Sequence, residues 1–203
     1  MKILIVSTLL PIYVFANIGT VMALKGEAKI KRSDIMNAKT GMDILQGDKI
    51  LTSFDSKMQV ILKDETVITI GEQSSFDFEK FHFDGTKNST VALKANKGSF
   101  RTVTGHTGKV APSRFKVKTL TATIGIRGTD FSVNIVDGKE IIKCHSGAIW
   151  VKYNDGEIKH ILADTLLTID QRRALKSEKL IKPPPVAKAA PPPPPPPPPP
   201  LTH

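Results

Sequence analysis

The sequence predicts an all-β fold, and three observations support that prediction. Short runs in which apolar and polar residues alternate, such as residues 58–63, 115–118 and 149–153, recur along the chain. Valine, isoleucine, threonine and phenylalanine dominate these runs, and these residue types favour strands over helices. Turn dipeptides such as Asp137-Gly138 separate the runs, and no segment before Asp170 keeps a helical period.

Residues 1–16 have the features of a secretory signal peptide. Lys2 precedes a short apolar run, and Val14 and Ala16 place small residues at the −3 and −1 positions of a cleavage site after Ala16. The run is shorter than the roughly 20 residues of a membrane-spanning helix. We therefore expect an exported protein of the periplasm or cell envelope, without a transmembrane segment after cleavage. The alternatives are a first buried strand and an uncleaved anchor.

Three zones follow the signal peptide. Residues 17–169 are the expected folded unit, and residues 170–182 form a charged closing segment. For that segment, a short helix capped by Asp170 and a final strand with a loop are both open. Residues 183–203 form a proline tail that adopts polyproline II or stays disordered and cannot join a sheet. The tail is either a semi-rigid spacer or docking element, or low-complexity sequence without a ligand.

Two patterns inside the folded unit concern its strands. The four phenylalanines of residues 76–83 change parity at Glu79-Lys80, which predicts a β-bulge that turns both pairs to one core. The alternative is that one pair forms an exposed contact patch. Residues 91–100 also resemble residues 140–149, since both contain an apolar strand, a polar corner ending in glycine and another strand. Such reuse fits a solenoid-like stack.

The block TATIGIRGTDF at residues 121–131 is the most specific motif in the chain. Gly125 allows another backbone to approach closely, and Gly128 adopts positive φ without steric cost. The block therefore predicts a strand, a tight corner and a second strand. Its structural signature consists of Gly125, Arg127, Gly128, Thr129, Asp130 and Phe131.

This block, in an all-β setting, resembles the signature of the FecR domain. The resemblance covers roughly residues 19–153 and is strongest over residues 115–153. It implies a single β-solenoid-like or β-roll domain, with a two-sheet β-sandwich as the alternative. The best-known FecR-domain proteins couple an outer-membrane receptor to a sigma factor through an anti-sigma region and a transmembrane helix. We expect neither region here, so the chain is similar to stand-alone exported FecR-domain proteins.

Within the signature, Arg127 and Asp130 suggest a structural pair. In that interpretation the guanidinium group bonds carbonyls at the corner, and Asp130 accepts from backbone N–H groups or from Arg127. The alternative is a ligand contact.

We expect no catalytic, cofactor or metal site. The five histidines form no HExxH or HxH motif, and a single cysteine excludes a CxxC motif. Cys144 and His145 are adjacent on a predicted strand and point to opposite faces, so they pair poorly as nucleophile and base. A buried, packed thiol is the expected state of Cys144, with an intermolecular bridge as the alternative.

The net charge of +10 suits an anionic partner. We do not expect nucleic acid, because the basic residues are scattered, aromatics are few and no RNA-recognition signature is present. Lysines at outward parity form a candidate binding face, namely Lys116, Lys118, Lys143 and Lys152.

The first hypothesis is a non-enzymatic scaffold or binding module of the envelope, which holds another envelope protein or a cell-wall polymer through a strand edge or this basic face. The second, implied by the resemblance, is an accessory regulator in sigma-factor signalling of the iron-transport type. An envelope enzyme is the third.

Overall fold

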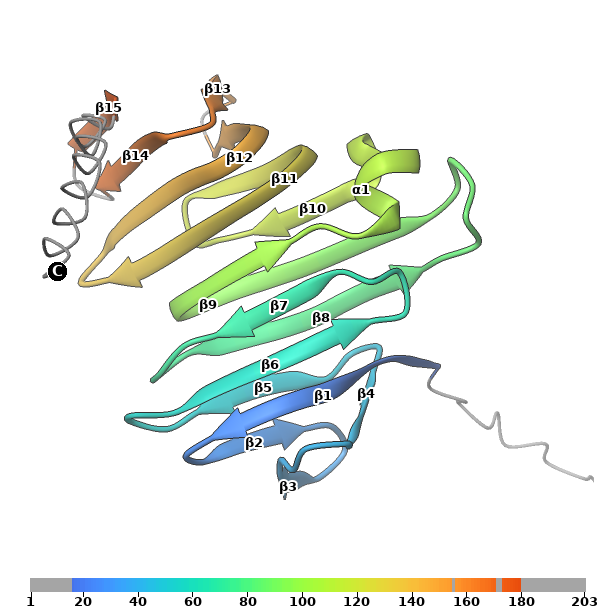
Figure 1. Cartoon of the computed structure of the whole chain (residues 1–203). Coiled ribbons are helices and arrows are strands. Elements are labelled where there is room, and N and C mark those ends of the chain that lie inside the picture. The colour runs from blue at the N-terminus through green and yellow to red at the C-terminus, as the bar shows by residue number, and fades with distance from the viewer. Residues whose placement is uncertain (1–15, 155, 171–172, 180–203) are drawn as a thin grey trace, which may run out of the picture.

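The computed structural model describes residues 16–154, 156–170 and 173–179, and it confirms the all-β prediction (Figure 1). The strands of the first half are β1 (Asn17–Lys25), β2 (Ala28–Lys31), β3 (Ile35–Asn37), β4 (Asp43–Leu45), β5 (Lys49–Thr52), β6 (Lys57–Leu62), β7 (Val67–Ile70) and β8 (Ser75–His82). They are followed by β9 (Thr90–Val103), α1 (His106–Val110), the 3₁₀ turn η1 (Pro112–Arg114), β10 (Phe115–Lys118), β11 (Ala122–Val136), β12 (Lys139–Tyr153), β13 (Ile158–Leu162), β14 (Thr165–Asp170) and β15 (Arg173–Lys179).

The strands stack as two facing layers with the core between them (Figure 1). Layer one has the order β15-β14-β12-β11-β9-β7-β6-β1-β4. Layer two has the order β13-β12-β11-β10-β9-β8-β5-β2-β3. The long strands β9, β11 and β12 contribute one half to each layer. The layers are therefore one rolled, unclosed sheet, as expected for a β-roll, and not two separate sheets.

Each long strand crosses between the layers at a glycine with positive φ. These glycines are Gly98 in β9 (φ 85°), Gly128 in β11 (φ 61°) and Gly147 in β12 (φ 77°). A residue with a side chain is strained in this backbone region, and glycine is not. The corner predicted at Gly128 is thus present. The similarity between residues 91–100 and 140–149 has the same origin, because each segment holds one such crossing.

The inward-facing side chains of both layers form one apolar core. Phe76 and Phe78 are buried, and Phe81 packs against the same core from beyond a register shift between Asp77 and Lys80. The predicted bulge is therefore present, but it turns only Phe81 of the second pair to the core, because Phe83 follows the end of β8 and its ring lies near that of His106, with centroids 6.1 Å apart. The bulge returns the third phenylalanine to the inner face, as parity requires once an extra residue is inserted.

The closing segment forms a strand and not a helix where the structure describes it. Strand β15 pairs antiparallel with β14, so the helical alternative for residues 170–182 is wrong over 173–179. The predicted signal peptide, apart from Ala16, and the proline tail lie outside the described residues. In the part of the chain described, no helix has both the length and the hydrophobicity that crossing a membrane requires.

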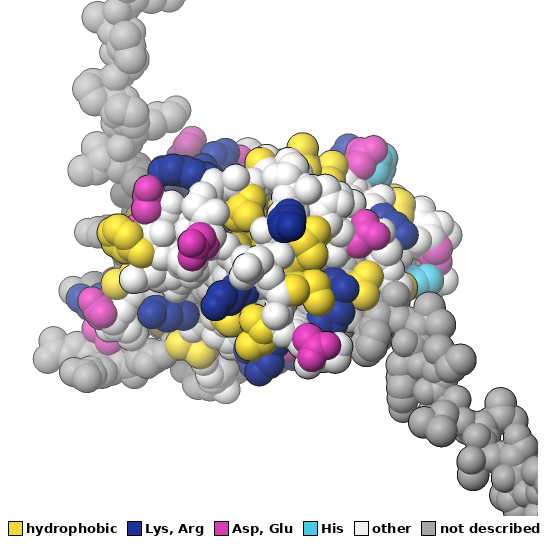
Figure 2. Space-filling model, turned by 90° about the horizontal axis from the view of Figure 1, so that it is seen from below, with side chains coloured by type: hydrophobic (Ala, Val, Ile, Leu, Met, Phe, Trp, Pro, Cys, Tyr) yellow, Lys and Arg dark blue, Asp and Glu magenta, His cyan; other side chains and the backbone are white. Residues whose placement is uncertain are grey.

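Two very short strands, β3 and β4, lie at one end of the stack, and short edge strands limit pairing with other chains. Figure 2 looks onto this end and shows hydrophobic side chains in the middle, interspersed with lysine and arginine. Met36 and Met42 pack against the core, whereas Ile35 is 61% exposed.

Candidate functional site

A row of lysines crosses the outer face of layer two. The strand register places the following residues side by side: Lys31, Lys49, Asp77, Lys94, Lys118, Thr123, Lys152 and Ile158. Five of the eight strands in this layer-two row therefore contribute a lysine at the same level, and we call this set the lysine row. Neighbouring strands lie about 4.8 Å apart, so the row from Lys31 to Lys152 extends over about 29 Å. The positive charges on this face are therefore aligned, although the basic residues are scattered along the sequence.

Two carboxylates neutralise part of this charge. Asp77 lies 3.4 Å from the Lys49 ammonium, and Glu79 lies 3.4 Å from that of Lys118. Among the described residues, Lys94 and Lys152 form no ion pair. The row begins in an open hollow of about 440 Å³, whose lining includes Lys31, Lys49 and Glu79. The outer face of layer two therefore keeps an excess of positive charge available to a ligand.

Trp150 lies against the sheet beside the lysine row. It is the cross-strand neighbour of Gly125, and a Cβ added at Gly125 would stand 1.9 Å from the indole Cε2 and 2.0 Å from Cζ2. The ring thus covers the glycine. Gly125 was expected to admit another backbone, but it is the Trp150 side chain that uses the space. Lys116 neighbours Gly125 on one side, and His160 neighbours Trp150 on the other.

The structure brings together three of the four lysines predicted to form a binding face. Lys116, Lys118 and Lys152 are exposed on the outer face of layer two. Lys143 is half-buried and belongs to the other half of β12, before the Gly147 corner, so it lies on layer one. Placing it with the others was wrong, because alternation along a strand predicts the face only up to a corner.

Sequence reasoning missed the rest of the row, including Lys31, Lys49 and Lys94. Their outward parity was readable from the sequence. Their alignment was not, because it depends on the register of strands that are far apart in the chain.

The predicted pairing of Asp130 with Arg127 is also wrong. Asp130 binds Arg101 of β9 through two contacts, Nε–Oδ1 at 2.8 Å and Nη2–Oδ2 at 2.5 Å, while Arg127 is exposed. The hydrogen bond from Arg101 lowers the pKa of Asp130. The other signature residues are structural, since the Thr129 N–H donates to Thr104 Oγ1 and Phe131 is fully buried.

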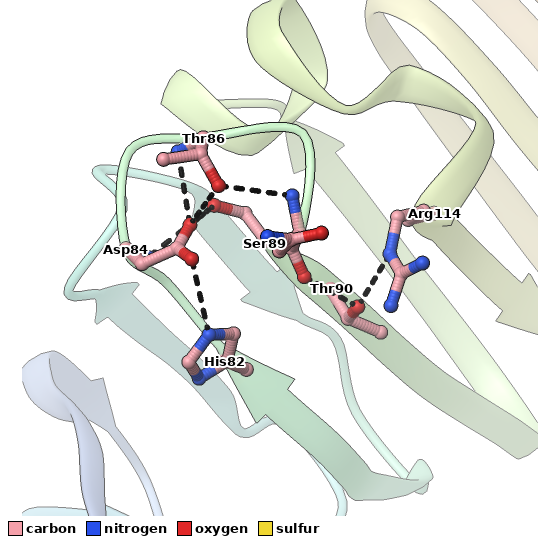
Figure 3. Close-up of polar contacts among 7 residues, drawn as sticks. His82, Asp84, Thr86, Ser89, Thr90 and Arg114 are labelled. Atoms are coloured by element: carbon pink, nitrogen blue, oxygen red, sulfur yellow. Dashed lines mark hydrogen bonds and ion pairs between the residues drawn. The ribbon is translucent and has the colours of Figure 1, made fainter.

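A second polar cluster, in the loop between β8 and β9, combines His82, Asp84 and Ser89 (Figure 3). Asp84 occupies its centre: it accepts from Ser89 Oγ at 2.9 Å and from the Thr86 N–H at 2.9 Å, and its other oxygen lies 3.4 Å from His82. The hydrogen bonds from Thr86, chiefly its N–H, lower the pKa of Asp84. A catalytic triad needs the serine on the histidine. Here both contact the aspartate instead, so the cluster fastens the loop.

A serine–histidine contact does occur on layer one, where Ser132 Oγ and His145 Nε2 are 2.9 Å apart. A triad also requires a carboxylate that binds the histidine, but the nearby Asp130 binds Arg101 instead. Burial, the largest cause, lowers the pKa of His145. The neighbouring Cys144 is fully buried on the opposite side of the strand, and burial raises the pKa of its thiol. The expected packed position of Cys144 is thus confirmed.

Metal binding finds no support in the described part of the chain, where no group of three histidine, cysteine or carboxylate side chains has suitable geometry. The lysine row with its adjacent tryptophan therefore remains the strongest candidate for a functional surface.

Comparison with known proteins bears on this surface. The family model described as FecR protein matches residues 48–150, just over half of the chain. The chain belongs to the FecR protein family. The match extends from the buried Asp48 to Trp150 and contains the signature block and most of the lysine row. No curated protein matches the chain.

Among solved structures, two crystal structures of a "putative anti-sigma factor" from Parabacteroides distasonis ATCC 8503 are similar, each with a TM-score of 0.54. Their sequences are 14% and 16% identical to this FecR-family chain. In each case the similarity covers 65% of this chain and 59% of the other. At this identity the similarity establishes the fold alone.

Proposed function

We propose that this FecR-family chain is an exported, non-enzymatic binding module that holds an acidic component of the cell envelope on the outer face of layer two. The single observation that supports the proposal is the lysine row, in which five lysines share one level of a rigid sheet. A fixed line of like charge attracts an opposite partner over several ångströms and orients it. Export is proposed from the features of residues 1–16.

The partner is proposed to contact the sheet directly and not the proline tail. A sheet face is rigid, so binding there costs little conformational entropy. An extended tail would act as a spacer for this face.

Pulldown from envelope extracts tests the proposal. The full chain is compared with the row variant Lys94→Gln/Lys118→Gln/Lys152→Gln and with the matched control Lys57→Gln/Lys139→Gln/Lys143→Gln, which removes the same charge from layer one. We expect the wild type and the control to recover the same envelope component and the row variant to lose it. Equal recovery by the row variant, or recovery by a peptide of residues 183–203 alone, would contradict the proposal. Fractionation of cells expressing the tagged chain tests export, and a cytosolic location would contradict it.

A second candidate is an accessory role in sigma-factor signalling. It is favoured by family membership and by the fold shared with the anti-sigma-factor structures. Deletion of the gene should then change transcription from a promoter that depends on the associated sigma factor. Unchanged transcription under all inducing conditions of that promoter would count against this role.

A further inference from the structure

We infer that the outer face of layer two binds a linear acidic polysaccharide, whose carboxylates lie along the lysine row while one sugar ring stacks on Trp150. The inference rests on the proposed function and names the chemical class of its ligand. It depends on two features that occur side by side, a charged line and a flat aromatic surface.

The charged line suits an extended polymer with regularly repeated anionic groups. Lys94 and Lys118 are direct neighbours in the row, and Lys152 follows two strands further on, about 10 Å away. A compact anion would contact only one or two of these ammonium groups. A chain of 1,4-linked uronate residues, which repeats its carboxylate at a length close to one strand spacing, reaches all three.

The aromatic surface suits a sugar ring. The C–H groups on one side of a pyranose pack well on a flat aromatic face, and an indole offers the largest such face among protein side chains. Trp150 is partly exposed, and Gly125 beneath it leaves the room that lets the ring lie against the sheet. The platform is therefore set before the ligand arrives, which reduces the entropy cost of binding.

The same face is less suited to the other two classes of macromolecule. A single-stranded nucleic acid is held by several aromatic side chains that stack on successive bases. Trp150 is the one large aromatic side chain with outward parity on this face in the described residues. A protein interface has an apolar centre and a polar rim. Within the described strands of this face, the large exposed apolar residues lie on the two edge strands, Ile35 on β3 and Ile158 and Leu162 on β13, so the apolar residues are at the rim and the charged residues at the centre.

Trp150 is the only tryptophan of the chain, so its fluorescence reports on this surface alone. The full chain is titrated with octagalacturonate, with its fully methyl-esterified counterpart, and with polyphosphate of similar charge. We expect octagalacturonate to change the emission of Trp150 and to bind more weakly as salt concentration rises, because screening weakens exposed charge pairs. The esterified oligomer, which keeps the sugar rings but not the charge, should bind at least tenfold more weakly. Polyphosphate should leave the emission nearly unchanged.

Two sets of variants separate charge from stacking, with affinities measured by calorimetry. Lys94→Gln/Lys118→Gln/Lys152→Gln should weaken octagalacturonate binding about tenfold, and the layer-one control Lys57→Gln/Lys139→Gln/Lys143→Gln should not change it. Trp150→Leu should also weaken it about tenfold. Gly125→Ala keeps the indole but displaces it from the sheet, and it should reduce the affinity for octagalacturonate severalfold. It provides a second test of stacking in case Trp150→Leu does not fold. Circular dichroism establishes that each variant is folded.

Three results would overturn the inference: equal binding of the charged and esterified oligomers, normal binding by the row variant, and binding of polyphosphate as tight as that of octagalacturonate with no effect of Trp150→Leu. If octagalacturonate fails to bind while recovery of an envelope component still depends on the row, the inferred class of ligand is wrong and the proposed function as a binding module is retained. If that recovery fails as well, both proposals fall.

Discussion

The two outer faces of the rolled sheet differ although they cover the same core. Layer one exposes scattered apolar residues, including Met22, Val103, Val136 and Ile141, and an Arg101–Asp130 ion pair. Layer two exposes the lysine row and Trp150, and its exposed apolar residues Ile35, Ile158 and Leu162 lie on the edge strands β3 and β13. Because β9, β11 and β12 contribute to both layers, the difference cannot come from separate domains. It comes from which half of each strand carries which outward residues.

This contrast shows that different positions of the same strands determine the fold and the surface properties. Inward positions and corner glycines determine that the sheet rolls, and the outward positions are left free for function. Substitutions at the corners should therefore affect both layers together, whereas substitutions on an outer face should affect that face alone.

The largest expected effect is at the corner of β12. A Cβ at Gly147 would lie 2.1 Å from the carbonyl oxygen of Gly128, a backbone atom that cannot move independently. Gly128 itself also has positive φ, but a Cβ there would meet nothing within 4 Å. Gly147→Ala should therefore reduce the free energy of unfolding by about 3 kcal/mol or more, and Gly128→Ala by about 1 kcal/mol. Urea denaturation measures both, and equal losses would show that the two corners are not constrained as the structure indicates.

Next in size is the ion pair beside the start of the lysine row. Asp48 is fully buried and receives Nε and Nη2 of Arg32, each at 2.7 Å, and the Leu45 N–H at 2.8 Å. Arg32→Ala leaves that carboxylate without its cation and should cost about 3 kcal/mol.

The layer-one pair provides the matched comparison for Arg32. The Arg101 side chain is 54% exposed, so Arg101→Ala should cost less than about 1 kcal/mol. Thermal or urea unfolding of both variants measures the two losses of stability. A larger loss for Arg101→Ala than for Arg32→Ala would contradict this ranking of the buried and the exposed ion pair.

Local patterns predicted the elements of this fold well, and long-range register explains what they missed. The bulge in β8 and the corner at Gly128 follow from parity and from the freedom of glycine, both of which are local. The partner of Asp130 is not local, because Arg101 precedes it by 29 residues and meets it only through the pairing of β9 with β11.

The candidate site shows the same limit. Lys143 and Lys152 lie on one continuous strand and both alternate outward, yet the Gly147 corner sends them to opposite faces. The contact of the Trp150 ring with Gly125 depends on the register of β11 with β12. A glycine followed 25 positions later by a tryptophan gives no sign of it.

A smaller effect is expected at the platform on layer two. Gly125 is not in the positive-φ region, so Gly125→Ala is tolerated by the backbone and acts by displacing the Trp150 ring. We expect a loss of about 1 kcal/mol and a red shift of the tryptophan emission as the ring becomes more exposed. Thr123→Ala, on the same face of the same strand, is the control and should leave the emission unchanged. Identical spectra for both variants would mean that the ring does not rest on Gly125.

The smallest expected effect is the pH dependence contributed by layer one. Arg101 lowers the pKa of Asp130 in the folded chain, so folding favours the ionised carboxylate. This contribution to stability is complete above the pKa of the unfolded chain, about 3.9, and is lost as the pH falls through the lower folded value. Arg101→Gln removes it, so the stability difference between wild type and Arg101→Gln should be below about 1 kcal/mol at pH 7 and should shrink below about pH 4. His145 also faces Asp130. In the unfolded chain a histidine is protonated below about pH 4. His145→Gln, introduced into the wild type and into Arg101→Gln, shows whether the charge of His145 contributes to the pH dependence of stability. Because the pair lies on layer one, octagalacturonate should not alter the pH dependence of the difference in stability between wild type and Arg101→Gln, and a change in that difference on adding the oligomer would indicate that the ligand binds layer one.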